Sequence, residues 1–204
     1  IWSRLVGSEM CIRDRLSFSS PLTVEVLNSD ILEVSENHSW ATFVFPGENQ
    51  TQEIQPFQRS IPIVLCTSDP RVPREGVRSG QDSQEIEFCR RTSLLRHLEV
   101  VQGPREEFEP HYNSHVLVFR HGRERSYALL QHQFLIATLS ASLPQRDSSL
   151  PTDRYVGSEE ATVRLNIRSV LAAAAQSEHR TLILSAWGCG SRGHPPQRVA
   201  EIFK

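Results

Sequence analysis

Cysteine is scarce in this chain, and the few that occur are widely spaced. The four cysteines among 204 residues are Cys11, Cys66, Cys89 and Cys189, and no two form a CxxC pair. This spacing argues against a zinc ribbon or a disulfide framework and favours a reducing, intracellular compartment such as the cytoplasm or nucleus. No apolar run approaches the roughly 20 residues that span a bilayer, so no membrane partner is expected.

An excess of charge is also lacking. The formal net charge is −2, which provides no general attraction for nucleic acid or anionic membranes, so no direct DNA binding is expected. The eight histidines are scattered, and His111 and His115 lie four residues apart in a loop-like context. We therefore expect no metal site. The hydrophobic share of 38% is enough for one domain with a real core.

The two ends of the chain need separate treatment. Residues 5–15, LVGSEMCIRDR, resemble translated sequencing-adapter sequence and lack the apolar run of a signal peptide. We interpret residues 1–15 as an adapter artefact outside the fold, and expect residues 16–204 to form a single domain. Residues 201–204 stop inside an expected helix, so we expect this domain to be truncated at its C-terminus.

Apolar runs and helical spacing alternate along the chain. The expected strands lie at residues 23–27, 61–65, 116–119, 134–139 and 182–184. The expected helices lie at 82–98, 159–176 and after Pro195, and a further helix could begin within 30–36. Strands separated by helices predict an α/β sandwich with a mixed or largely parallel sheet. Residues 140–157 form a long polar connection, which is typical of functional or mobile loops.

One segment near the C-terminus carries the sharpest motif. In residues 181–203, TLILSAWGCGSRGHPPQRVAEIF, an apolar strand is followed by three glycines, two prolines and a helical apolar spacing. A strand, a glycine-rich loop and a helix start can hold phosphate, because amide groups and the positive end of the helix dipole face the anion. An ordinary strand-to-helix turn uses the same residues, so both interpretations stay open at this point.

A second segment adds to the first. Residues 64–94 read VLCTSDPRVPREGVRSGQDSQEIEFCRRTSL, and residues 23–32 read TVEVLNSDIL. Together with the C-terminal motif these segments resemble the microbial-type poly(ADP-ribose) glycohydrolases, and the resemblance covers most of residues 22–204. It implies a macrodomain-like α/β fold, a three-layer sandwich in which a mixed sheet is flanked by helices.

The resemblance also implies a site. ADP-ribose, free or as part of poly(ADP-ribose) or an ADP-ribosylated protein, would lie across the carboxyl edge of the sheet. Four residues would hold its diphosphate: Gly188, Cys189, Gly190 and Gly193. Gly76 would shape the loop around the ribose, and Gln84 and Glu85 would stand at the catalytic position. No metal and no cofactor are implied.

The chain departs from the family pattern where the chemistry would take place. Cleavage of a glycosidic bond needs a carboxylic acid beside the leaving oxygen, and the position of the family's catalytic acid carries Ile86. The family's triple glycine is Arg74, Glu75 and Gly76 in this chain. In the glycine-rich loop, Arg192 replaces an aromatic residue and His194 replaces an asparagine.

Whether the protein is an enzyme is therefore left open by the sequence, with three hypotheses. It could be a glycohydrolase that uses Glu85, an inactive module that still binds ADP-ribose, or a scaffold that kept only the fold.

Overall fold

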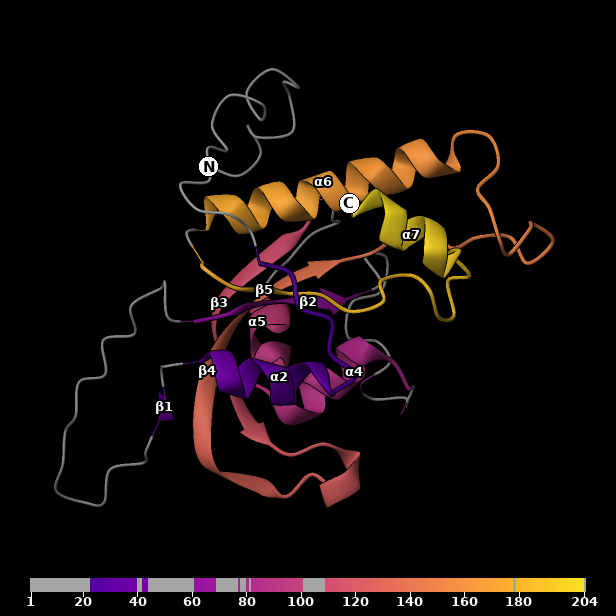
Figure 1. Ribbon diagram of the computed structural model, residues 1–204. Helices are drawn as coiled ribbons and strands as arrows, with labels where there is room; N and C mark the ends of the chain where they lie inside the picture. The colour runs from indigo at the N-terminus through magenta and orange to yellow at the C-terminus, as the bar shows by residue number, and fades with distance from the viewer. Residues whose placement is uncertain are drawn as a thin grey trace, which may run out of the picture.

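The computed structural model describes residues 23–39, 42–43, 61–68, 77, 80, 82–100, 109–177 and 179–203. These residues form a mixed sheet between two layers of helices, as Figure 1 shows. The strands are β1 (Thr42–Phe43), β2 (Ile63–Thr67), β3 (His111–Arg120), β4 (Leu129–Ala141) and β5 (Leu182–Ile183). The helices are α2 (Ile31–His38), α4 (Gln84–Arg91), α5 (Leu94–Val100), α6 (Glu159–Gln176) and α7 (Pro196–Ile202), with a short 3-10 turn, η3, at Arg123–Arg125. The three-layer α/β prediction is confirmed.

Strand β4 is the centre of the sheet. It pairs antiparallel with β3 on one side, and on the other side it pairs parallel with β2 and antiparallel with β1. Strand β5 extends the sheet beyond β2, again in parallel. The carboxyl ends of β2, β4 and β5 therefore point the same way, and the segments that follow them meet at one edge.

The period-two alternation of β2 and β4 divides the core into two clusters. Ile63 and Leu65 face helix α6, while Val64 and Cys66 face α2, α4 and α5. Helix α6 has the expected bounds and buries Val163, Ile167, Val170 and Ala174. Leu171, which the spacing places on the same face, is 38% exposed. Each strand therefore serves both layers, which a sheet covered on both faces requires.

Three sequence predictions are wrong. Residues 23–27 are not a strand, and Val26 is 94% exposed, because none of the described strands pairs with this segment. The helix expected at 82–98 is two helices, since Thr92 adopts an extended backbone, bridges to Val118 and caps α5 through its hydroxyl group. His111 and His115, which were expected in a loop-like context, both belong to β3.

Candidate functional site

The candidate site lies at the carboxyl edge of the three parallel strands. This is where open α/β sheets bind ligands. The end of β2 is joined to the end of β4 by a hydrogen bond from the Ser68 amide to the Ala141 carbonyl group, 3.1 Å long. Helices α4, α6 and α7 all begin on this side of the sheet, toward the right in Figure 1.

Residues 188–193, here called the glycine loop, connect β5 to α7. The loop closes on itself through hydrogen bonds from Gly193 N to Gly190 O and from His194 N to Gly188 O, 2.9 and 3.0 Å long. Gly188 and Gly193 have φ angles of +75° and +72°, in the left-handed region that side chains disfavour. The loop conformation thus depends on glycine at these two predicted positions.

The outer part of the glycine loop presents amide groups. Gly190 and Ser191 are exposed, and within the described residues their amides donate to no other group. A Cβ atom on Gly190 would have no heavy atom within 4 Å, so the space beside it is open. Exposed amides without a hydrogen-bond partner suit an anion such as a diphosphate.

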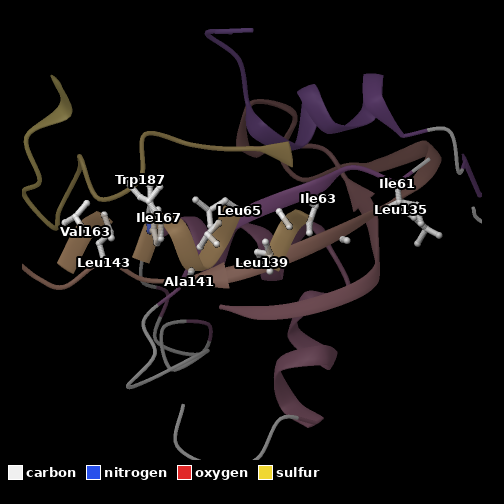
Figure 2. Packing of buried hydrophobic residues seen from close by; sticks show 13 residues of the cluster. Ile61, Ile63, Leu65, Leu135, Leu139, Ala141, Leu143, Val163, Ile167 and Trp187 are labelled. Atoms are coloured by element: carbon white, nitrogen blue, oxygen red, sulfur yellow. The ribbon is translucent and has the colours of Figure 1, made fainter. Parts of the chain in front are cut away.

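Trp187 anchors the glycine loop in the core. Its side chain is 1% exposed and belongs to the cluster on the α6 face of the sheet. Figure 2 shows it beside Leu143, Val163 and Ile167 at one end of that cluster. The glycine loop therefore follows directly on a residue that is packed in the core.

The loop at residues 142–157 braces the glycine loop through hydrogen bonds to its carbonyl groups. The Gln145 side-chain amide donates to the Ser191 carbonyl group over 2.9 Å, and the Arg146 guanidinium donates to the Gly193 carbonyl group over 2.9 Å. Arg146 is also paired with both carboxylate oxygens of Glu159, at 2.8 and 3.0 Å. The polar 140–157 connection noticed in the sequence is therefore in contact with the candidate site.

His194 is a buried, neutral part of this brace. Its Nε2 atom is 2.8 Å from the Pro144 carbonyl oxygen, which can only accept, so Nε2 carries the proton. Its Nδ1 atom then accepts from the Tyr155 hydroxyl group over 3.2 Å. Burial lowers the pKa of His194, with the nearby Arg146 charge acting in the same direction. Burial raises the pKa of Tyr155 to about 12, which keeps it a hydrogen-bond donor.

Cys189 is a packed thiol in the glycine loop. It is half-buried, and its Sγ atom lies 3.6 Å from the Trp187 carbonyl oxygen. Burial raises the pKa of the Cys189 thiol. A raised pKa disfavours the thiolate, so Cys189 is poorly suited to act as a nucleophile.

The start of α4 carries the predicted catalytic pair. The Gln84 side-chain oxygen accepts from the amide and the hydroxyl group of Thr67, at 2.9 and 2.6 Å, and so ties α4 to the carboxyl end of β2. Ser83 caps the helix through the Ile86 amide. Glu85 is 5% exposed and Ile86 is 2% exposed, so both first-turn side chains are packed inward.

The neighbours of Glu85 on α4, Glu87 and Cys89, are in different surroundings. Burial, together with the charge of Glu85, raises the pKa of the Cys89 thiol to about 12. Glu87 accepts from the Tyr127 hydroxyl group over 3.0 Å, and its Oε2 atom lies 3.6 Å from Nη1 of Arg90. Glu87 is therefore engaged on the outer face of the helix, which leaves Glu85 as the acidic group of α4 that is packed inward.

Two parts of the sequence prediction remain outside this geometry. Gly76, the residue expected to shape the ribose loop, lies outside the described residues, as do Arg74 and Glu75. His111 and His115 lie on β3, and among the described residues no group of three or more metal-ligating side chains could hold a metal ion. None of the described helices is both long and apolar enough to cross a membrane.

Sequence reasoning missed Arg146, Tyr155 and Glu159. The available signals were the polar 140–157 connection and an acidic residue in the first turn of α6. Neither signal indicates which groups these side chains contact.

The sandwich and its glycine loop define the class of the domain, which is a macrodomain-like α/β fold. Solved structures make this more specific. Poly(ADP-ribose) glycohydrolase from Thermomonospora curvata has a TM-score of 0.55 and 28% sequence identity, over 70% of this chain and 54% of that one. The same enzyme bound to the inhibitor ADP-HPD has a TM-score of 0.56 at 28% identity, over 70% and 56% of the two chains.

A further similar structure is the glycohydrolase from Deinococcus radiodurans in complex with ADP-ribose. Its TM-score is 0.53 at 24% identity, over 71% of this chain and 60% of that one, and at this identity the likeness concerns the fold. The chain holds a microbial poly(ADP-ribose) glycohydrolase-like domain. It spans little more than half the length of the first structures it resembles. No family model and no curated protein matches it.

Proposed function

We propose that this domain recognises the ADP-ribose unit and binds its diphosphate with the glycine loop. The observation that carries the proposal is the pair of exposed Gly190 and Ser191 amides in a loop that Trp187 and Arg146 hold in place. Exposed, unpaired amides in a braced loop can bind an anion with little further ordering. The glycohydrolases with ADP-ribose or ADP-HPD bound support this ligand class.

The proposed ligand is ADP-ribose itself or the ADP-ribose unit of poly(ADP-ribose) or of an ADP-ribosylated protein. An intracellular location, cytoplasm or nucleus, is part of the proposal, because Cys89 and Cys189 are free thiols and thiols stay reduced in those compartments. Neither a cofactor nor DNA has a part in it.

The residues of this chain support hydrolysis less well than they support ligand binding. Ile86 occupies the acid position and cannot transfer a proton, and loss of a general acid lowers the rate by about 10²–10⁴-fold. We therefore propose that the domain binds ADP-ribose but cleaves ADP-ribosyl bonds slowly or not at all.

The competing proposal is a hydrolase that uses Glu85 as its acid. Glu85 lies in the first turn of α4 and is packed inward, in a buried setting that can suit a general acid. A Glu85→Gln variant separates the two proposals. If Glu85 is the acid, this variant loses poly(ADP-ribose) cleavage that the unchanged chain performs.

Calorimetric titration of the full chain with ADP-ribose tests the binding proposal. Because Gly190 has open space around it and its φ is not positive, Gly190→Leu should fold normally and place its side chain where the diphosphate binds. Ala200→Leu on the exposed side of α7 is the matched control. We expect low-micromolar binding by the unchanged chain and the control, and none by Gly190→Leu. No heat at millimolar ADP-ribose from folded protein would refute both binding and catalysis and favour a scaffold.

A further inference from the structure

Arg146 is an unusually buried cation for a polar connecting loop. It is 7% exposed, although it belongs to the 142–157 loop and to no helix or strand. Burial of a charged group is strongly unfavourable unless the group is paired and hydrogen-bonded. The contacts of Arg146 should therefore explain why it is held in this position.

All five N–H groups of the Arg146 guanidinium are used. Nε and one Nη2 hydrogen bind the two carboxylate oxygens of Glu159, at 2.8 and 3.0 Å. The other three bind the carbonyl groups of Pro151, Gly193 and Arg154, at 3.0, 2.9 and 3.1 Å. The guanidinium carbon also lies 5.5 Å from the centre of the Tyr155 ring. Lysine could not reproduce this set, because its ammonium group has three donors and no planar fork.

Glu159 completes the pair at the first turn of α6. Its second carboxylate oxygen also accepts from the Val156 amide over 2.8 Å, which closes the end of the 142–157 loop. The Arg146 hydrogen bonds hold the pKa of Glu159 below its ordinary value. The carboxylate is therefore ionised at neutral pH, and the charge of Arg146 is neutralised by Glu159 and is not available to a ligand.

The consequence for the glycine loop lies in its carbonyl groups. Those of Ser191, Arg192 and Gly193 are bound in turn by the Gln145 side chain, the Arg146 amide and the Arg146 guanidinium, at 2.9, 3.2 and 2.9 Å. Three consecutive carbonyl oxygens thus face the 142–157 loop. Because these hydrogen bonds fix their direction, the three oxygens cannot turn toward a bound anion and repel it.

We propose that Arg146, with Glu159, is a positioning residue for diphosphate binding. It fixes the carbonyl groups of the glycine loop so that the exposed Gly190 and Ser191 amides face the ligand, and it does not touch the ligand itself. This inference rests on the proposed function. It adds that the affinity for ADP-ribose is set partly by a side chain outside the recognised motif.

The test compares Arg146→Lys, Arg146→Gln and Glu159→Gln with a matched control, Arg164→Gln. Arg164 forms an ion pair with Glu160 on the same helix, 2.8 Å long, and is 46% exposed. The control therefore removes an arginine–glutamate pair without disturbing the glycine loop. If Arg146→Gln fails to fold, the lysine and Glu159 variants still decide the question.

Hydrogen exchange measures positioning without any ligand. In the Arg146 variants we expect amide exchange in residues 185–195 to rise by about tenfold or more, because charge-assisted hydrogen bonds are lost. Exchange in the middle of α6 should remain unchanged, and Arg164→Gln should alter neither segment. Unchanged exchange in residues 185–195 would overturn the proposal.

Calorimetry with ADP-ribose measures the consequence for binding. We expect the Kd of Arg146→Lys to rise about tenfold or more while the stoichiometry stays near that of the unchanged chain. A purely structural effect would instead lower the stoichiometry and leave Kd unchanged, and that result would overturn the proposal. If the unchanged chain binds no ADP-ribose, the proposed function fails, and hydrogen exchange alone then decides whether Arg146 positions the loop.

Discussion

The glycine loop offers a sharp test because two of its glycines differ in their surroundings. A Cβ atom on Gly188 would lie 2.7 Å from Cδ1 of Leu143 and 2.8 Å from Cδ2 of His194, and Gly188 has a φ of +75°. Neither neighbour can move easily, since Leu143 is fully buried and both ring nitrogens of His194 are hydrogen-bonded. Gly190→Ala meets neither obstacle.

The expected loss of unfolding free energy in Gly188→Ala has two parts. The left-handed backbone disfavours alanine by roughly 1–2 kcal/mol. Overpacking against two fixed neighbours adds about 1–3 kcal/mol. The free energy of unfolding should therefore fall by roughly 2–5 kcal/mol, whereas for Gly190→Ala it should change by no more than about 0.5 kcal/mol.

Urea unfolding at pH 7.5, followed by far-ultraviolet circular dichroism, measures both variants against the unchanged chain. The midpoint should shift for Gly188→Ala with little change in slope, which identifies a loss of stability. Equal midpoints for Gly188→Ala and the unchanged chain would refute the loop geometry. An equally large loss in Gly190→Ala would show that the surroundings of Gly190 are not open.

Three further predictions concern separate parts of the domain. Asp30 caps α2 and pairs with buried Arg91; burial disfavours its ionisation, but the Arg91 bond and charge and two helix amides outweigh this and lower its pKa. Asp30→Asn keeps the cap but should lower the urea midpoint at pH 7, with the difference disappearing as pH falls through the lowered pKa of Asp30. Because the pKa of His194 is lowered, the folded state binds fewer protons than the unfolded state below about pH 6.5. The free energy of unfolding should therefore fall as the pH is lowered from 7.5 to 5.5. This fall should be less steep in His194→Gln, whereas in the exposed control His132→Gln it should be as steep as in the unchanged chain. Ile86→Glu should raise ADP-ribose release from poly(ADP-ribose) by up to about 10²–10⁴-fold, measured by chromatography, and a folded variant with no gain would contradict the assignment of this position.

Local patterns predicted the elements whose signal is contained in their own residues. Helix α6, 18 residues long, was predicted with its observed bounds, because an apolar face recurs from Val163 to Ala174. Strand β4 was predicted at its buried residues 134–139, and it extends to Leu129–Ala141 because its outer residues pair with β2 and β3. Periodicity identifies a face but not the length over which a partner strand is present.

Two of the wrong predictions share one cause. Residues 23–27 alternate as a strand does, but alternation does not create a neighbouring strand edge. The 82–98 segment has helical spacing throughout, yet Thr92 leaves the helix to bridge β3 and to cap α5. In both cases a contact distant in sequence, or its absence, decided the local backbone.

The sequence by itself determined what each position can do chemically. Isoleucine at position 86 cannot transfer a proton, and glycine at 188 permits a backbone that other residues disfavour. The tertiary structure alone decided what the Arg146 guanidinium binds, since its acceptors lie 5, 8, 13 and 47 residues away. Residue identity is a local property, whereas the hydrogen-bond partners of a buried cation depend on how distant segments pack. For this reason the glycine loop was recognised from sequence, and the side chain that braces it was not.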